Sequence, residues 1–287
     1  MSEPNQRLGL VLEGGAMRGL YTAGVLDVFL EQGIRADGVI GVSAGTVHGV
    51  SYVAGQHGRS IRYYEKYRSD KRFMGLYPLL TTGDIVDKKF CYEDIPWRLD
   101  PFDNDAFVRA GVPFYVTCTN VETGRPEYIR CTDFKGTDAM EYLRAGASMP
   151  LVSRIVEVGG KKLLDGGVAD SIPLAAFRKM GYVKNIVVLT RAAGYRKRPA
   201  GLLPFRLAYR SYPAFVQAMA NRHEVYNREV EAAECGAADG SVFLLRPSVD
   251  LEVSRTERSV AKLRALYELG RSDTLARLGE LKHFCQK

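Results

Sequence analysis

The residues best suited to chemistry lie at positions 41–45, which read Gly-Val-Ser-Ala-Gly. A serine with a glycine two residues away on each side is typical of a nucleophile elbow when a strand precedes it and a helix follows. Residues 38–40 are apolar and predict a short buried strand, and residues 46–54 can form a helix. Such a helix directs its positive N-terminal end at Ser43, which favours an alkoxide or a tetrahedral anion there.

Gly41 and Gly45 are the residues that would let the chain turn so sharply. Neither carries a Cβ atom that would clash in the turn. The alternative interpretation is a chance run of five small residues, because such matches are common on pattern alone. The predicted strand and helix on either side favour Ser43 as a nucleophile.

A second glycine-containing run, at positions 13–19, reads Glu-Gly-Gly-Ala-Met-Arg-Gly. A nucleophile of this kind needs donors for the oxyanion, and glycines let successive backbone N–H groups turn toward one point. Gly14, Gly15 and Ala16 are therefore the candidate donors, and Arg18 would add a positive charge beside them. The alternative is an ordinary strand-to-helix turn.

A nucleotide-phosphate loop is a further alternative for this run, and the sequence argues against it. A dinucleotide fingerprint requires glycine where Ala16 stands, and a P-loop requires lysine directly after Gly19, where Leu20 stands. An oxyanion hole fits better, because parallel strands place their carboxyl ends at one edge of a sheet.

The base for Ser43 is a choice between an aspartate and a histidine. Asp165 follows two leucines and precedes Gly166 and Gly167, so a strand would carry it into a tight turn. Burial there would raise its pKa and make the carboxylate a better base. The order Ser43, Asp165, His223 would also satisfy an α/β-hydrolase triad.

None of the four histidines has an evident catalytic setting in the sequence. His223 falls in a charged helical pattern, which is more typical of a solvated surface. His48 lies on the helix predicted to follow the nucleophile and is expected to point away from Ser43. His57 lies in a polar stretch between two glycines.

The composition limits the classes of partner. The net charge of +7 suits an anionic membrane surface or acidic substrates. We find no nucleic-acid-binding module and no zinc-type spacing, so we expect no nucleic acid, no metal and no organic cofactor.

Five cysteines, an odd number, indicate reduced thiols and a cytoplasmic protein. We find neither a signal peptide nor a membrane-spanning run, so any contact with lipid would be peripheral.

The pattern of apolar segments predicts a three-layer α/β/α fold with a mainly parallel central sheet. Beyond the two strands near the motifs, further strands are expected at 113–119, 127–130, 155–158, 161–164, 185–190 and 242–245. We expect a catalytic domain over residues 8–190 and a mostly helical region over residues 191–287, packed on the same core.

Two segments carry weaker signals. Residues 63–105 lack clear regularity, and their apolar part at 73–80 is interpreted as either a flap over the substrate or a buried loop. Residues 194–210 carry five arginines and lysines, no acidic residue and interleaved apolar side chains. That stretch would suit an anionic lipid surface, or it is a solvated linker into a helix.

The motifs together resemble those of the patatin-like phospholipase family. They occur in the family's order: the glycine run at 13–19, the elbow at 41–45 and Asp-Gly-Gly at 165–167. Residues 145–150, Ala-Gly-Ala-Ser-Met-Pro, also resemble the small-residue segment upstream of the family's aspartate. The resemblance covers roughly residues 8–190 and is strongest with the bacterial type that has only a patatin domain.

The resemblance implies a serine acyl hydrolase that cleaves carboxylic esters of lipids, of the phospholipase, lipase or esterase type. By this analogy Ser43 attacks the ester carbonyl, Asp165 activates it without a histidine, and an acyl-enzyme forms and is hydrolysed. The backbone amides of the glycine run, with Arg18, would hold the oxyanion.

The sequence departs from the family pattern at two positions. The family usually has aspartate where Glu13 stands and a third glycine where Ala16 stands; alanine retains its N–H but restricts φ. Two alternatives follow from the residues: a lipid-binding or regulatory protein of this fold with weak or no turnover, and a triad esterase that uses His223.

Overall fold

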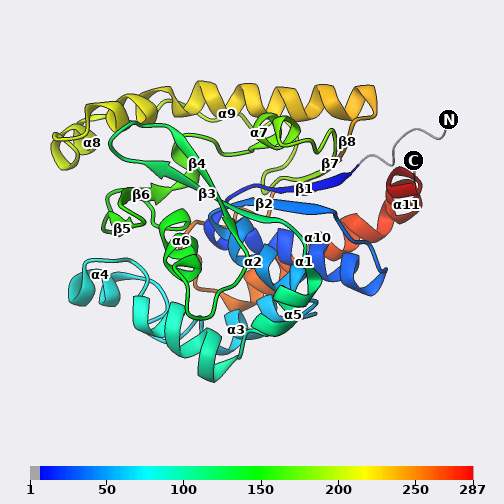
Figure 1. The fold of residues 1–287 in the computed structure, drawn as a ribbon, viewed down its shortest axis with the longest axis horizontal. Coiled ribbons are helices and arrows are strands. Elements are labelled where there is room, and N and C mark those ends of the chain that lie inside the picture. Colours follow the sequence, from blue (N-terminus) through cyan, green and yellow to red (C-terminus); the bar gives the residue numbers. More distant parts are fainter. Residues whose placement is uncertain (1–6, 287) are drawn as a thin grey trace.

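The computed structural model describes residues 7–286, which form an eight-stranded sheet (Figure 1). Its strand order is β5-β6-β3-β2-β1-β7-β8, with β4 paired to β3 outside this path. The strands are β1 (Leu8–Leu12), β2 (Gly38–Val42), β3 (Phe114–Asn120), β4 (Pro126–Cys131), β5 (Val156–Val158), β6 (Lys161–Asp165), β7 (Lys184–Val188) and β8 (Val242–Leu245). From β3 through β2, β1 and β7 to β8 the pairs are parallel, whereas β4, β5 and β6 join antiparallel.

Helices cover both faces of this sheet, because the central strands are apolar on both faces and every residue of β1, β2 and β7 is buried. One face carries α7 (Leu174–Lys179) and the long α9 (Pro213–Asp239), and the other carries α1 (Leu20–Glu31) and α2 (Ala44–Val53), with α10 (Val260–Ala276) against α1 (Figure 1). The predicted three-layer α/β/α fold is confirmed.

Further helices connect or flank these elements. They are η1 (Ala16–Gly19), α3 (Arg59–Tyr67), α4 (Leu76–Thr82), η2 (Lys89–Leu99), α5 (Asn104–Ala110), α6 (Ala139–Gly146), η3 (Gly166–Val168), α8 (Leu203–Ala208) and α11 (Leu278–Gln286). No helix within residues 7–286 combines the length and the apolar character needed to cross a bilayer.

The segment at 63–105 is helical, so the prediction of an irregular segment there is wrong. It contains the end of α3, then α4 and the wide π-helix η2, which includes Pro96. A π-helix does not repeat every 3.6 residues, and its side chains line a cavity rather than one flat core face. The expected amphipathic period is therefore absent from the sequence.

The C-terminal part of the chain shares the sheet and the core with the N-terminal part. Strand β8 pairs in parallel with β7, and α10 crosses α1 at very close range. A Cβ atom on Gly270 of α10 would lie 2.1 Å from the carbonyl oxygen of Tyr21 in α1. The hydroxyl of Tyr267 also donates a 2.7 Å hydrogen bond to the buried carboxylate of Asp27.

We predict that Gly270→Ala lowers the free energy of unfolding by about 1–3 kcal/mol, because the added methyl must push two helix backbones apart. Gly279→Ala is the matched control: no atom lies within 4 Å of its Cβ position, and alanine there should be neutral or stabilising by up to about 1 kcal/mol. Urea unfolding of both variants measures the difference. Equal stabilities would contradict the close crossing of α1 and α10.

Candidate active site

Ser43 occupies the corner between β2 and α2, with φ 53° and ψ −123°. This conformation is unfavourable for a residue with a side chain and costs about 1–3 kcal/mol, a strain that is typical of functional sites. The side chain is only 8% exposed, yet it lines both of the cavities described below. The predicted strand, serine and helix are therefore present in the expected order.

The corner is held by close backbone contacts on both sides of Ser43. A Cβ atom on Gly41 would lie 2.7 Å from the Cα of Thr46, and one on Gly45 would lie 2.5 Å from the carbonyl oxygen of Leu12. Both distances are too short for any side chain. Glycine at these two positions is thus required for β1, β2 and α2 to meet at the turn.

The glycine run lies directly beside the serine. A Cβ atom on Gly14 would be 2.9 Å from the Cβ of Ser43. The backbone amides of Gly14 and Gly15 donate no hydrogen bond to any acceptor within residues 7–286, and both residues line a cavity together with Ser43. Unpaired amides facing a nucleophile are what an oxyanion hole requires, so Gly14 and Gly15 remain candidate donors.

Ala16 continues the run with a left-handed backbone, φ 49°. Glycine adopts this region freely, whereas alanine does so at a cost of about 1–2 kcal/mol. The sequence-based concern about φ at this position is therefore borne out by the backbone itself. The residue still lies beside Ser43 and lines both cavities.

Glu13, the other departure from the family pattern, anchors this loop. Its buried carboxylate accepts hydrogen bonds from the backbone amide of Thr190 at 2.5 Å and from the Thr190 hydroxyl at 3.1 Å. The same hydroxyl lies 3.2 Å from the carbonyl oxygen of Gly14. Glu13 thereby ties the carboxyl end of β1 to the segment after β7, which holds the glycine run in place.

Asp165 is the last residue of β6, which pairs antiparallel with β3 and brings the aspartate close to Ser43. In the sheet register Val42 of β2 pairs with Thr117 of β3, and the next residue, Cys118, pairs with Asp165 at the end of β6. The Asp165 carboxylate accepts a 2.8 Å hydrogen bond from the amide of Gly167. The Asp-Gly-Gly turn thus orients the carboxylate through its own backbone.

Burial raises the pKa of Asp165, and this is the largest influence on it. Hydrogen bonds from the Ser43 hydroxyl and the Gly167 amide, and the positive charges of Arg222 and Arg255, offset part of the rise. A buried carboxylate that is next to a serine hydroxyl and has a raised pKa is a better general base than an ordinary aspartate.

No histidine within residues 7–286 lines either cavity. His48 is buried, and its Nδ1 atom lies 3.0 Å from the hydroxyl oxygen of Ser60. Burial lowers the pKa of His48 to about 3. His57 pairs with Glu31 at 2.7 Å. The Nδ1 atom of His223 lies 3.0 Å from the carbonyl oxygen of Ala220 within α9. The geometry gives the triad alternative no histidine at the site.

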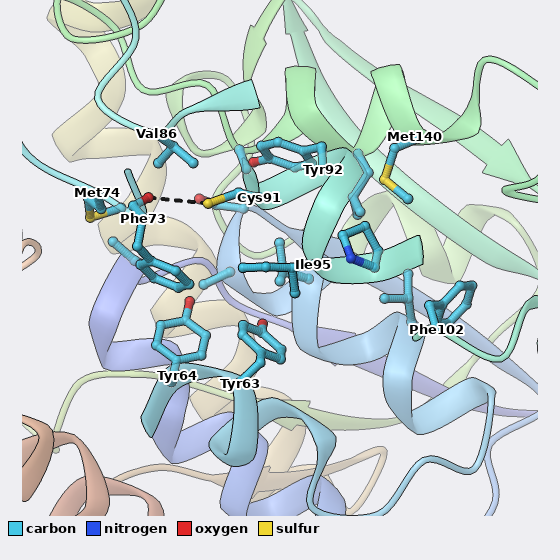
Figure 2. Close-up of a pocket in the computed structure, with 18 of the residues that line it drawn as sticks. Tyr63, Tyr64, Phe73, Met74, Val86, Cys91, Tyr92, Ile95, Phe102 and Met140 are labelled. Carbon is cyan, nitrogen blue, oxygen red and sulfur yellow. Dashed lines mark hydrogen bonds between the residues drawn. The ribbon is translucent and has the colours of Figure 1, made fainter. Parts of the chain in front are cut away.

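Ser43 stands at the boundary of two cavities, and Ala16 and Met149 line both of them as well. The first, of about 120 Å³, is apolar. Figure 2 shows Tyr63 and Tyr64 rising from α3 on one side of it, Ile95 between, and Tyr92 and Met140 on the other side. Phe73 also lines this cavity, so the segment at 73–80 begins as a buried wall and continues as the exposed helix α4.

The second cavity, of about 380 Å³, has a mixed lining of apolar and basic side chains; we call it the cationic chamber. Its five positively charged residues are Arg18, Arg191, Lys197, Arg222 and Arg255, and its carboxylates are Glu13 and Asp165. Burial, Arg222 and Arg255 lower the pKa of Lys197 to about 7. Sequence reasoning placed only Arg18 at the site. It missed Arg222 and Arg255, because nothing but their charge marks them in the sequence.

Within residues 7–286, no group of three or more histidine, cysteine, aspartate or glutamate side chains is arranged to hold a metal ion. All five cysteines are free thiols.

Comparisons with known proteins show the family of this chain. A model of the family described as "Patatin-like phospholipase" matches residues 10–178, and one of a "Domain of unknown function (DUF6363)" matches residues 212–286. Since the first match covers more than half of the chain, this protein belongs to the patatin-like phospholipase family.

The individual relatives share less than a third of their aligned residues with this chain. The chain is 29% identical over 188 residues to "Uncharacterized protein YjjU" of Escherichia coli, a match that covers 64% of this chain and 51% of that protein. It is 29% identical over 182 residues to "Lysophospholipase NTE1" of Saccharomyces cerevisiae, covering 61% of this chain and 10% of that protein. The chain thus spans about half of the bacterial relative and a small part of the fungal one. Among solved structures, VipD from Legionella pneumophila aligns with a TM-score of 0.46 and 11% identity, over 96% of this chain and 67% of that chain.

We predict that ester hydrolysis, measured as kcat/KM against pH, falls on the acid side with a midpoint above the ordinary aspartate pKa of about 3.9. The base must be ionised, and burial raises the pKa at which Asp165 loses its proton. Arg222→Met should move the midpoint to higher pH, because the positive charge of Arg222 favours the carboxylate form. A midpoint at or below 3.9 (about the free aspartate value) in folded protein would contradict this assignment.

We predict that Ala16→Gly leaves stability unchanged or raises it by about 1 kcal/mol, because glycine relieves the left-handed strain. Ala147→Gly is the matched control: Ala147 lines the apolar cavity at an ordinary φ of −108°, so glycine there should be destabilising. Thermal unfolding of both variants provides the comparison. If Ala16→Gly lost as much stability as Ala147→Gly, the left-handed backbone at position 16 would not lower the free energy of unfolding.

Proposed function

We propose that this protein is a serine hydrolase that cleaves the carboxylic ester of a lipid, with Ser43 as nucleophile and Asp165 as base. The observation that carries the proposal is the position of Ser43. It lies on a strained turn beside unpaired backbone amides and a buried carboxylate, at the opening of an apolar cavity. An acyl chain in that cavity would bring its ester carbonyl to the serine.

In the proposed reaction, Ser43 Oγ attacks the ester carbonyl carbon as Asp165 accepts the hydroxyl proton. The amides of Gly14 and Gly15 stabilise the negative oxygen of the tetrahedral intermediate. The bond to the alcohol then breaks, Asp165 returns the proton to the departing alkoxide, and an acyl-enzyme remains. Water, activated by Asp165, attacks the acyl group and releases the fatty acid and the free serine.

The relatives support the same class of substrate. The fungal proteins of the NTE1 group are named lysophospholipases, and one of them matches this chain over 182 residues. A lysophospholipid has one acyl ester to cleave, which suits a site with one apolar cavity at the nucleophile. The sequence-based alternative of a lipid-binding protein without turnover rests on Ala16 alone.

We predict that Ser43→Ala and Asp165→Asn each reduce hydrolysis of a single-chain lipid ester by at least about 10³-fold, since each removes a group that takes part directly in the proposed reaction. His223→Ala, a matched surface control, should retain activity within about twofold. The readout is the release of fatty acid, together with labelling by a fluorophosphonate, which should mark wild type and not Ser43→Ala. A folded wild type that binds lipid without releasing fatty acid would favour the regulatory alternative, and loss of activity in His223→Ala would favour the triad.

The contact with lipid that we propose lies on the exposed leucines of α4 and α8. Leu203 and Leu207 of α8 are 68% and 69% exposed, and Leu76 and Leu80 of α4 are similarly exposed. Hydrogen bonds join the two helices through the segment at 151–152: the Leu151 amide donates to the Tyr209 hydroxyl, and the Ile85 amide donates to the Val152 carbonyl. Both helices lie at the same end of the molecule (Figure 1).

Cationic side chains accompany these leucines, because Arg206 and Arg210 are exposed on and beside α8. This combination of apolar and basic side chains suits the surface of an anionic bilayer. Within the basic stretch at 194–210, Arg196 is instead paired with Glu234 at 3.1 Å and Lys197 lines the cationic chamber. The stretch thus divides into a part that faces the site and a part that faces solvent.

We predict that replacing Leu203 and Leu207 together by serine weakens binding to vesicles that contain phosphatidylglycerol by about 10-fold or more, because their apolar surface no longer enters the interface. Leu275→Ser is the control, since Leu275 is an exposed leucine of α10. Co-sedimentation with vesicles measures binding. Unchanged binding by the double variant would remove α8 from the lipid contact.

A further inference from the structure

The cationic chamber is a second cavity at Ser43, and most of its lining residues differ from those of the apolar cavity. A lipid ester held with its acyl chain in the apolar cavity would therefore direct its alcohol part, which carries the headgroup, into the chamber. The two cavities meet at Ser43, Ala16 and Met149, so the scissile bond would lie at their boundary. The chemistry of the chamber then decides which headgroups the enzyme accepts.

Four of the five chamber cations, Arg191 among them, come from outside the region that matches the patatin family model. Lys197 follows β7, Arg222 lies on α9, and Arg255 lies between β8 and α10. The last two belong to the region that matches a domain of unknown function. Burial is the largest cause that lowers the pKa of Lys197, Arg222 and Arg18, and repulsion adds to it: Arg222 and Arg255 lower the pKa of Lys197, and Arg255 also lowers the pKa of Arg222 and of Arg18.

The fold fixes Arg222 and Lys197 in place by hydrogen bonds, whereas Arg255 is exposed on its loop. The Arg222 guanidinium donates from Nε to the carbonyl oxygen of Gly167, 2.5 Å away, in the Asp-Gly-Gly turn. Asn227 clamps the Lys197 backbone with two hydrogen bonds of 2.8 and 3.1 Å. The Lys197 ammonium lies 3.9 Å from the centre of the Tyr226 ring. Keeping like charges together in a partly buried space is costly unless an anion binds between them.

The two carboxylates of the chamber favour the charged forms of nearby cations, Glu13 for Arg18, Lys197 and Arg222 and Asp165 for Arg222, but both carboxylates already accept hydrogen bonds from other groups. Glu13 is bound to the amide and hydroxyl of Thr190, and Asp165 is committed to Ser43 and Gly167. Within residues 7–286 no other carboxylate lines the chamber. The Nε atom of Arg18, which also lines it, is buried and has no hydrogen-bond partner among these residues. The chamber therefore has cations for a phosphate and no free acid for the ammonium of a choline group.

We propose that Lys197, Arg222 and Arg255 bind the phosphate of a net-anionic headgroup, so that the preferred substrate is an acyl ester of glycerol phosphate. This inference rests on the proposed ester hydrolysis and specifies its substrate. It also gives the C-terminal region a role, because that region supplies two of the three phosphate ligands. A neutral monoacylglycerol would lack the charge, and a choline ester would bring a cation into a cationic chamber.

The test compares three single-chain substrates with the same acyl chain, all in monomeric form: 1-acylglycerol 3-phosphate, 1-monoacylglycerol and 1-acylglycerol 3-phosphocholine. Wild type should show a kcat/KM for the phosphate ester about 10-fold or more above the other two. Lys197→Met and Arg255→Gln should each lower the ratio of phosphate ester to monoacylglycerol about 10-fold. Lys197→Arg should retain most of the preference, and Arg198→Met, which removes an exposed neighbouring charge outside the chamber, should leave the ratio unchanged.

Equal turnover of the three substrates, or a ratio unmoved by Lys197→Met and Arg255→Gln, would overturn the inference. If wild type hydrolyses none of them, the proposed function fails, and binding tests the chamber separately. Calorimetry with Ser43→Ala should then show binding of glycerol 3-phosphate that is lost in the Ser43→Ala, Lys197→Met double variant. Inorganic phosphate that binds as tightly would identify a free phosphate as the ligand rather than a lipid headgroup, and no binding of either would overturn the chamber as an anion site.

Discussion

The strained backbone at Ser43 is the constraint on which the rest of the site depends. Holding a serine at φ 53° costs about 1–3 kcal/mol, so the surrounding fold must enforce it. That enforcement comes from the contact of β1 with the start of α2, where the carbonyl oxygen of Leu12 leaves no space for a side chain at Gly45. Because β1 continues into the glycine run, the contact that strains the serine also places the candidate oxyanion donors beside it.

Asp165, the proposed base, is subject to a different constraint, the cost of burying a carboxylate. Asp165 is buried at the end of β6 and is compensated by the Gly167 amide, the Ser43 hydroxyl and the charge of Arg222. Burial raises its pKa because the compensation is incomplete. If these contacts with Asp165 were weaker, the side chain would stay protonated. If they were stronger, the carboxylate would be too stable to accept a proton. The raised pKa thus follows from the same contacts that hold Asp165 against the serine.

The sequence predicts the parts of this protein whose signals are local. Strand β1 and the two-glycine hairpin between β5 and β6 follow from apolar runs and turn chemistry, and the backbone at Gly159 and Gly160 has the positive φ that such a turn needs. The position of Asp165 next to Ser43 could not be predicted from the sequence. It depends on the register of β3 with β2 and with β6, which pairs antiparallel with β3. Arg222 and Arg255 were equally hidden, because long-range packing of α9 and the loop after β8 brings them to the serine.

That long-range packing explains why one chain can join two unlike cavities at a single nucleophile. The aromatic wall from α3 and η2 is built by residues between β2 and β3, whereas the cations of the chamber arrive mainly after β7. The central sheet lies between α9, which carries Arg222, and α3, which carries Tyr63 and Tyr64, and Ser43 stands at the carboxyl end of its strand (Figure 1). Apolar and cationic surroundings can therefore change independently, while the strained turn and the buried aspartate between them stay the same.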